Sequence, residues 1–240
     1  MTDVQPAPGE ATTERVRGIF SNIAERYDTF NAMASMGIDR SWRKKLVKAC
    51  MLGSESRVVD LCAGTGDVAL AIAERAKPAE VVVSDFTPEM LDVAREKIAA
   101  YQGPTKLSVQ LADAQDLPFD DASFDCATVA FGVRNLPERE RNFAEVLRVL
   151  KPGGRYVILE FSRPTLAPFR GAYHLYLRHA IPAIGGVLTG DREGFVYLND
   201  SIRRFPTQPE LAAELREAGF SAISWTDLTG GIVALHVAVK

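Results

Sequence analysis

Short apolar runs alternate with helix-like patterns along most of the chain from about residue 57 onward. The runs typical of buried strands cover residues 57–61, 81–85, 107–111, 125–130 and 156–161, and the intervening segments 66–76, 88–101 and 137–150 have the spacing of helices. Strands that are separated by helices form βαβ units. The pattern therefore predicts a parallel sheet with helices on both faces.

The pattern changes after residue 162. Residues 163–206 show no clean alternation but contain six aromatic residues, namely Phe169, Tyr173, Tyr176, Phe195, Tyr197 and Phe205. A helix is expected at 208–218, followed by strands at 223–226 and 232–239, and the hairpin-length connection "DLTGG" indicates that these two strands are antiparallel. We therefore expect an α/β, doubly wound fold: a seven-stranded, mostly parallel sheet with an antiparallel terminal hairpin and a helical, aromatic lid insertion.

The chain is expected to form a single domain over residues 16–240. Residues 1–15 contain Pro, Gly and acids and have no apolar signal core, which predicts a flexible N-terminal tail. Within the domain, residues 16–50 are interpreted as an N-terminal helical cap. Residues 163–206 are interpreted as the lid insertion before the last two strands.

The composition narrows the class of function. Hydrophobic residues make up 47% and charged residues 25% of the chain, as in ordinary folded domains, and the net charge of −3 lacks the basic excess of nucleic-acid-binding domains. Cys50, Cys62 and Cys126 lack metal-ligand spacing and favour a reducing compartment. We therefore expect a cytoplasmic protein without metal or nucleic acid. No uncharged apolar run approaches the length needed to span a bilayer, so any contact with the inner face of the membrane is expected to be peripheral. A homodimer is left open.

Three acids follow three successive predicted strands. Asp60 ends the first strand shortly before Gly64-Thr65-Gly66 enters a helix, Asp85 ends the second, and Asp113 follows the third. Glycines let the backbone approach a ligand, and a helix N-terminus presents free N–H groups. Because the carboxyl ends of parallel strands meet at one edge, Asp85 would accept the hydroxyls of an adenosine ribose. Asp113 or its neighbouring backbone would bind the adenine amino group.

Two residues at the helix start indicate which adenosine ligand is bound. A dinucleotide site usually has a third glycine and a helix N-terminus free for pyrophosphate, but Ala69 takes the glycine position and Asp67 would repel phosphate. A phosphate-free cation fits better, which favours S-adenosylmethionine, whose ammonium group Asp60 would hold. A tight turn without a ligand, a nicotinamide-dependent oxidoreductase and a non-catalytic adenosine-binding module are the alternatives.

Longer motifs cover nearly the whole chain from about Val16: "YDTFNAMASMGIDRSWR", "DLCAGTGD", "FGVRNLPERE" with "LRVLKPGGR", "LEFSRP", "YLNDSIRRFP" and "TGGIVALH". They resemble the ubiquinone/menaquinone biosynthesis C-methyltransferases, a branch of the Rossmann-like class I S-adenosylmethionine-dependent methyltransferases. The resemblance implies methylation of a ring carbon of a prenylated hydroquinone. A methyltransferase acting on a soluble aromatic or natural-product substrate is the alternative.

The resemblance also implies cofactor positions. Thr65 matches the family's loop threonine, Asp85 with Phe86 matches the acid after the second strand, and Asp113-Ala114 matches the pair after the third. Ala130 stands where ubiquinone-type members carry a serine before "FG", so that contact is absent here. Together with the short chain, Ala130 favours demethylmenaquinol as substrate. The motif "GIDR" departs from the family's "GIHR", so no role is carried over for that histidine.

Arg134 and Asn135 follow the predicted fourth strand. Methylation of a ring carbon needs an electron-rich ring, hence a phenolate, although an unperturbed phenol has a pKa of about 10. The permanently charged Arg134 would stabilise the phenolate and Asn135 would donate to the second ring oxygen. In the alternative interpretation, Arg134 pairs with Glu138 or Asp67 and Asn135 caps the helix that begins at Pro137.

The general base is less well defined by the sequence. Arginine is too basic to accept a proton, so His179, which matches a histidine of some ubiquinone-type relatives, is the candidate. A surface or core role for His179 is the alternative. Tyr27, Asp28 and Asn31 belong to the N-terminal motif and are expected to close over the cofactor.

Residues 163–192 contain four arginines against a single acid, together with a large apolar face. A helical cap packed on the sheet would explain the apolar face alone. A prenyl tail, however, needs an apolar slot and a route out of the bilayer. We therefore expect this insertion to act as a lid that makes reversible contact with the membrane surface.

Overall fold

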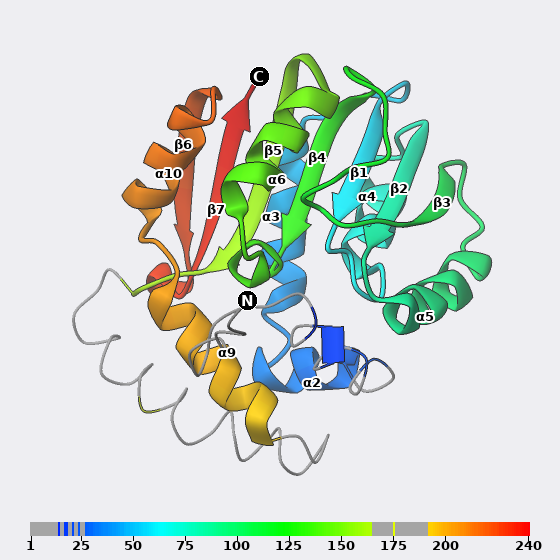
Figure 1. Cartoon of the computed structure of the whole chain (residues 1–240). Coiled ribbons are helices and arrows are strands. Elements are labelled where there is room, and N and C mark those ends of the chain that lie inside the picture. The colour runs from blue at the N-terminus through cyan, green and yellow to red at the C-terminus, as the bar shows by residue number, and fades with distance from the viewer. Residues whose placement is uncertain are drawn as a thin grey trace, which may run out of the picture.

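The computed structural model describes residues 27–164 and 192–240, together with Glu14, Arg17, Gly18, Ser21, Ala24 and Leu175. Within these residues one sheet contains β1 (Arg57–Leu61), β2 (Glu80–Asp85), β3 (Lys106–Leu111), β4 (Phe124–Ala130), β5 (Leu150–Phe161), β6 (Ser221–Leu228) and β7 (Val233–Val239). The strand order is β3-β2-β1-β4-β5-β7-β6 (Figure 1). Strands β1 to β5 pair in parallel, and β7 pairs antiparallel with β5 and β6. The predicted mostly parallel sheet with an antiparallel terminal hairpin is confirmed.

Helices cover both faces of the sheet. One face packs against α3 (Asp39–Cys50), α4 (Asp67–Arg75) and α5 (Pro88–Ala99), and the other packs against α6 (Arg139–Val149) and α10 (Gln208–Glu217). Strand β5 supplies side chains to both layers because successive residues of a strand point to opposite faces. Val157 and Leu159 lie in the first layer, and Tyr156 and Ile158 lie in the second.

The largest boundary difference lies at the start of β5. We predicted a stop at residues 151–154 and a strand only from Tyr156, but β5 already begins at Leu150. The register against β4 shifts between Phe124 and Cys126, and Gly153 has a φ of +78°. Glycine adopts this left-handed conformation readily, so the "KPGG" segment forms an irregular extension of the strand rather than a separate turn.

The carboxyl ends of the central parallel strands point towards two further helices, α2 (Tyr27–Ala34) and α9 (Arg192–Arg204) (Figure 1). Helix α2 belongs to the predicted cap and α9 to the predicted insertion. Most of the insertion, including His179 and most of the arginine-rich segment, lies outside the described residues. The domain boundaries and the lid therefore stay predictions.

Candidate active site

A pocket lies where β1, β2, β3 and β4 end. The space between its walls amounts to about 670 Å³, part of which is open to solvent. Its walls include many of the predicted site residues, namely Gly64, Asp85, Phe86, Asp113, Ala114, Ala130 and Asn135. Asp60, Thr65, Gly66 and Arg134 are not among the lining residues. The structure thus brings most of the expected positions to one cavity and leaves four of them beside it.

The charge of this pocket bears on its ligand. Among the described residues that line it there are two carboxylates, Asp85 and Asp113, and no lysine, arginine or histidine. A pyrophosphate would meet no cation there, whereas a sulfonium and an ammonium group would be attracted. The lining therefore fits S-adenosylmethionine better than a dinucleotide.

The glycine loop after β1 is held by the acid of β2. Asp85 Oδ2 accepts the Gly64 N–H at 2.8 Å, and Asp85 Oδ1 accepts the Thr87 N–H at 2.9 Å. Gly64 and Gly66 have φ values of +54° and +81°, which glycine tolerates without strain. A Cβ on Gly66 would lie 3.4 Å from the Cβ of Ala94, so this glycine also permits close packing of α5. The loop is thus built around a buried carboxylate that faces the pocket.

Asp60 lies beside the pocket with an unusual environment. Its Oδ1 accepts the Thr128 hydroxyl at 2.6 Å, while its Oδ2 has no hydrogen-bond partner among the described residues. Burial raises the pKa of Asp60 to about 7, against the opposing effect of the Thr128 hydrogen bond. The predicted contact between Asp60 and the ammonium group of the cofactor stays a prediction, because Asp60 does not line the pocket.

We expect Asp60 to make the fold less stable as pH rises. In the unfolded chain its carboxyl ionises near about 3.9, but in the fold it keeps its proton up to a pKa of about 7. Between these values the folded state binds more protons, so the free energy of unfolding falls with increasing pH, by at most about 1.4 kcal/mol per pH unit. Urea unfolding across this window should show a shallower fall for Asp60→Asn. An unchanged slope would contradict the shifted pKa.

Thr65 connects the glycine loop to the N-terminal cap. Its hydroxyl donates to Asp28 Oδ1 at 2.6 Å and accepts from Lys97 Nζ at 3.0 Å, and Lys97 also pairs with Asp28. Lys97 and Arg43 both pair with Asp67, at 2.7 and 2.6 Å. Although its partial burial opposes the effect, these two cations lower the pKa of Asp67. Asp67 is thus ionised but offset by two cations, so it repels phosphate less than the sequence argument assumed.

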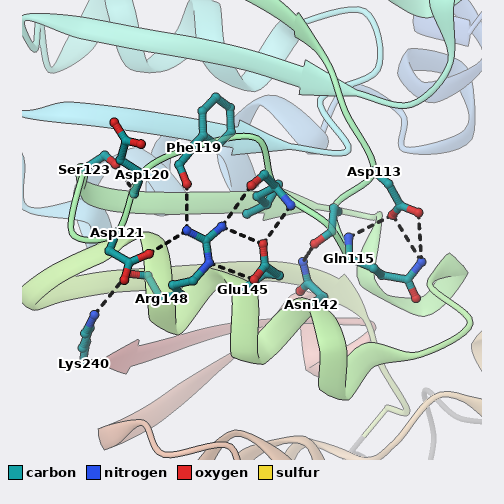
Figure 2. A network of polar contacts seen from close by, with 12 residues as sticks. Asp113, Gln115, Phe119, Asp120, Asp121, Ser123, Asn142, Glu145, Arg148 and Lys240 are labelled. Carbon is teal, nitrogen blue, oxygen red and sulfur yellow. Dashed lines mark hydrogen bonds and ion pairs between the residues drawn. The ribbon is translucent and has the colours of Figure 1, made fainter.

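The segment after β3 is fixed to helix α6 (Figure 2). Asp113 Oδ1 accepts the backbone N–H of Gln115 at 2.9 Å and its side-chain amide at 3.2 Å. Asn142 of α6 donates to the Ala114 carbonyl at 2.7 Å and accepts the Tyr156 hydroxyl at 2.8 Å. These bonds fix the position of the predicted adenine-binding pair Asp113-Ala114 at the pocket wall.

Arg134 forms a buried ion pair that the sequence did not predict. Its Nη1 lies 2.9 Å from Glu160 Oε1, at the end of β5, and also donates to the carbonyl of Phe131. The partner is therefore neither Glu138 nor Asp67. Glu160 also accepts the backbone N–H of Phe161 at 2.8 Å, and the guanidinium lies 5.3 Å from the centre of the Phe161 ring. Burial raises the pKa of Glu160 and the charge of Arg134 opposes that rise.

Asn135 lines the pocket and is oriented by the predicted insertion. It ends the short 3₁₀ helix η2 (Val133–Asn135), and its Oδ1 accepts the hydroxyl of Tyr197 on α9 at 3.1 Å. Its Nδ2 lies 3.4 Å from the Phe131 carbonyl. The expected alternative, a cap on the following helix, is not seen in the contacts of Asn135, and α6 begins only at Arg139. Both Asn135 and Tyr197 are buried.

Sequence reasoning missed three partners of the predicted residues: Glu160, Gln115 and Tyr197. A usable signal existed for Glu160, because an ionisable residue inside the apolar run "YVILEF" needs a partner of opposite charge. Gln115 and Tyr197 had no comparable signal, since their contacts depend on how loops and helices meet. His179 lies outside the described residues, so its proposed role has no structural test here.

Two further findings concern the part of the chain that the structure describes. It contains no group of three or more His, Cys, Asp or Glu side chains arranged to hold a metal ion. None of its helices is long and apolar enough to cross a membrane.

The strand order, the glycine loop and the acids that follow successive strands define a class I S-adenosylmethionine-dependent methyltransferase. The chain belongs to the ubiE/COQ5 methyltransferase family, whose model matches residues 9–240. The chain is 42% identical over 228 residues to the ubiquinone/menaquinone biosynthesis C-methyltransferase UbiE of Geobacter sp. strain M21, covering 95% of this chain and 97% of the relative. It is 43% identical over 225 residues to the demethylmenaquinone methyltransferase of Streptomyces avermitilis, covering 94% of each.

Solved structures share the fold at low sequence identity. The [4+2]-cyclase SpnF superposes with a TM-score of 0.71 at 16% identity, over 96% of this chain and 97% of that chain. An S-adenosylmethionine-dependent methyltransferase of Thermotoga maritima superposes with a TM-score of 0.62 at 20% identity, over 93% and 99%. Because the first of these is named for a cyclisation, fold similarity alone does not define the reaction. The family match carries that information instead, and the oxidoreductase alternative is set aside.

Proposed function

We propose that this enzyme methylates a ring carbon of a prenylated hydroquinone and that its substrate is demethylmenaquinol, which becomes menaquinol. The names of the relatives support the class of substrate. Ala130, in place of the serine of ubiquinone-type members, lines the pocket and supports the menaquinone branch. The proposed cofactor, S-adenosylmethionine, supplies an electrophilic methyl group on a sulfonium.

The cofactor-binding residues are assigned from the pocket wall. Asp85, which already fixes the Gly64 N–H, would accept the ribose hydroxyls with its remaining lone pairs. The side chain of Asp113 and the backbone of Ala114 would hold the adenine. Thr65 would act mainly by joining the loop to the cap, because its hydroxyl already bonds Asp28 and Lys97.

The environment of Tyr27 is the observation that carries the proposed chemistry. Tyr27 is a phenol that lines the pocket; burial raises its pKa, the hydrogen bond with Asn31 and the charge of Arg134 lower it, and the carboxylates of Asp85 and Glu160 add to the rise. The charge of Arg134 thus acts on a phenol in this pocket in the direction of the phenolate, although Arg134 does not line the pocket and burial outweighs its effect on Tyr27. A substrate phenol bound in the same cavity would receive the same contribution from the charge of Arg134, which favours the electron-rich ring that methylation requires.

Asn135 would make the direct contact with the ring. Its Oδ1 is occupied by Tyr197, so its Nδ2 is the end available to donate to a ring oxygen. Bound S-adenosylmethionine would supply its methyl group to the ring carbon, and the ring proton would leave to restore aromaticity. His179 stays the candidate acceptor of that proton.

The function is tested with purified enzyme, S-adenosylmethionine and three acceptors: a short-tailed demethylmenaquinol, a short-tailed demethylated ubiquinol precursor and a water-soluble catechol. Mass spectrometry should detect methyl transfer to a ring carbon of the demethylmenaquinol. Methylation of the ubiquinol precursor alone would reassign the branch. Methylation of the catechol alone would replace the proposal by the soluble-substrate alternative.

A further inference from the structure

The outward face of α3 is strongly basic. Every residue of this helix is described, and its exposed residues are Arg40, Ser41, Lys44, Lys45 and Lys48. The acid of the helix, Asp39, is buried and bonds Ser35 and Arg43. The outer face thus presents four cations and no acid, although the chain as a whole has a net charge of −3. A helix face of one sign on an acidic protein indicates an anionic partner.

The four cations are free of ion pairs within the described part of the chain. Arg43, on the same helix but facing the fold, is bound by two carboxylates. The outer cations have no such partners among the described residues, so their charge is directed to solvent. Within the described part of the chain, they therefore do not stabilise the fold through ion pairs.

Exposed apolar side chains flank this basic face. Met33, Met36 and Ile38 precede α3 with 49%, 78% and 37% of their surface exposed, and Met51 follows it with 71% exposed. Apart from these four, the exposed large apolar side chains of the described residues are Leu111, Leu175 and Trp225. Methionines are flexible and adapt to irregular apolar surroundings. A concentration of exposed apolar side chains marks an interaction site.

The inner side of α3 reaches the pocket. Trp42 packs with its ring centre 6.1 Å from that of Phe131, which lines the pocket. Helix α3 runs along the sheet from the end where α2 lies (Figure 1), and Tyr27 of α2 also lines the pocket. The basic face is therefore separated from the pocket wall by the thickness of one helix.

We infer that the outer face of α3, with Met33, Met36, Ile38 and Met51, binds the surface of an anionic lipid bilayer. The inference rests on the proposed function, because a substrate with a long prenyl tail is dissolved in the bilayer and the pocket must reach it. Each Lys or Arg near an anionic surface strengthens binding about fivefold, and the methionines would enter the interface between headgroups and acyl chains.

Other partners fit this face less well. A second copy of the chain on a twofold axis would place the four cations against four identical cations, which is unfavourable. A nucleic acid would match the charge of the α3 face but would not provide an apolar environment for the exposed methionines. This contact does not involve the predicted lid, since the α3 face lies entirely within the described residues.

The test compares vesicles of phosphatidylglycerol and phosphatidylcholine with vesicles of phosphatidylcholine alone, by co-sedimentation of the full chain. We expect wild-type protein to bind the anionic vesicles, less at high salt. The variant Lys44→Glu/Lys45→Glu/Lys48→Glu should bind at least about 10²-fold more weakly, because three cations are lost and three anions are added. Met36→Ser/Met51→Ser should weaken binding without changing charge. The matched control for net charge is Arg75→Glu/Lys77→Glu/Arg216→Glu. These three residues lie on α4, just after α4 and on α10, respectively.

The outcomes distinguish a failure of the proposed α3 surface from a failure of the proposed function. Retained binding by the α3 triple variant, an equal loss in the control, or no binding by wild type would each overturn the inference. Turnover of a short-tailed, detergent-dissolved demethylmenaquinol should be the same in the triple variant and wild type, while turnover of a long-tailed substrate in vesicles should fall with binding. Vesicle binding through α3 by an enzyme that methylates no quinol would instead refute the proposed function alone.

Discussion

Replacing Arg134 by methionine should destabilise the fold and remove most of the activity, and adding Glu160→Gln should restore the fold without restoring the activity. The Arg134 and Glu160 side chains are both buried, and their charged atoms lie 2.9 Å apart. Removing one member of a buried pair leaves an uncompensated charge and costs about 3–5 kcal/mol. Replacing both members removes that cost, and a glutamine can still accept the Phe161 N–H that Glu160 accepts.

The activity should respond differently from the stability, because the proposed role of Arg134 depends on its charge. If Arg134 stabilises the phenolate in the transition state, its loss should lower kcat on the order of 10²–10³ in both the single and the double variant. Raising the pH towards about 10, the ordinary pKa of a phenol, should partly restore turnover in the double variant, because solvent then supplies the phenolate.

Thermal melts and pH–rate profiles of both variants provide the measurement. The half-exposed pair Arg139–Glu214 gives a matched control, since Arg139→Met/Glu214→Gln removes an ion pair of the same length, 2.9 Å, away from the pocket. That control should change stability by about 1 kcal/mol or less and leave kcat unchanged. Wild-type turnover in the Arg134→Met/Glu160→Gln enzyme would show that Arg134 is only a structural partner of Glu160.

The sheet could be predicted from the sequence because its signals are local. Each signal can be recognised within a few residues: the apolar run of β1, the glycines after it and the acid that ends β2. The topology of a parallel sheet then brings the strand ends together. The pairing of Arg134 with Glu160 could not be predicted in the same way. These residues are 26 positions apart, and their contact depends on the turn after β4.

That turn explains why the directions of the Arg134 and Asn135 side chains could not be predicted from the sequence. Phe131 has a φ of +59°, a conformation that few non-glycine residues adopt. Nothing in the sequence "FGVRN" predicts this conformation. With the backbone in this shape, the Phe131 carbonyl lies within reach of both Arg134 Nη1 and Asn135 Nδ2. Arg134 consequently lies beside the pocket and Asn135 lines it. The sequence identified the two residues but not this division between them.

The same turn leads to a prediction about Tyr197. Its hydroxyl donates to Asn135 Oδ1 at 3.1 Å, which leaves Asn135 Nδ2 as the end that can donate to the substrate. Without this bond only the longer contact of Nδ2 with the Phe131 carbonyl, at 3.4 Å, holds the amide of Asn135. We expect the amide then to rotate and present its oxygen, which would repel a phenolate. We therefore predict that Tyr197 is a positioning residue that acts through Asn135, and that its effect depends on Asn135 being present.

A double-mutant cycle on kcat makes this dependence measurable. Tyr197→Phe should lower kcat about 5- to 30-fold, the equivalent of one lost hydrogen bond of about 1–2 kcal/mol, and Asn135→Ala should lower it on the order of 10²-fold. The double variant should be no slower than Asn135→Ala alone, because the group that Tyr197 orients has gone. Tyr156→Phe is the matched control, since Tyr156 donates to the amide of Asn142 at 2.8 Å outside the pocket lining. In the Tyr156→Phe/Asn135→Ala variant, the two reductions of kcat should multiply, because the two residues act independently. If the reductions also multiply in the Tyr197→Phe/Asn135→Ala variant, Tyr197 stabilises the packing of α9 and does not orient Asn135.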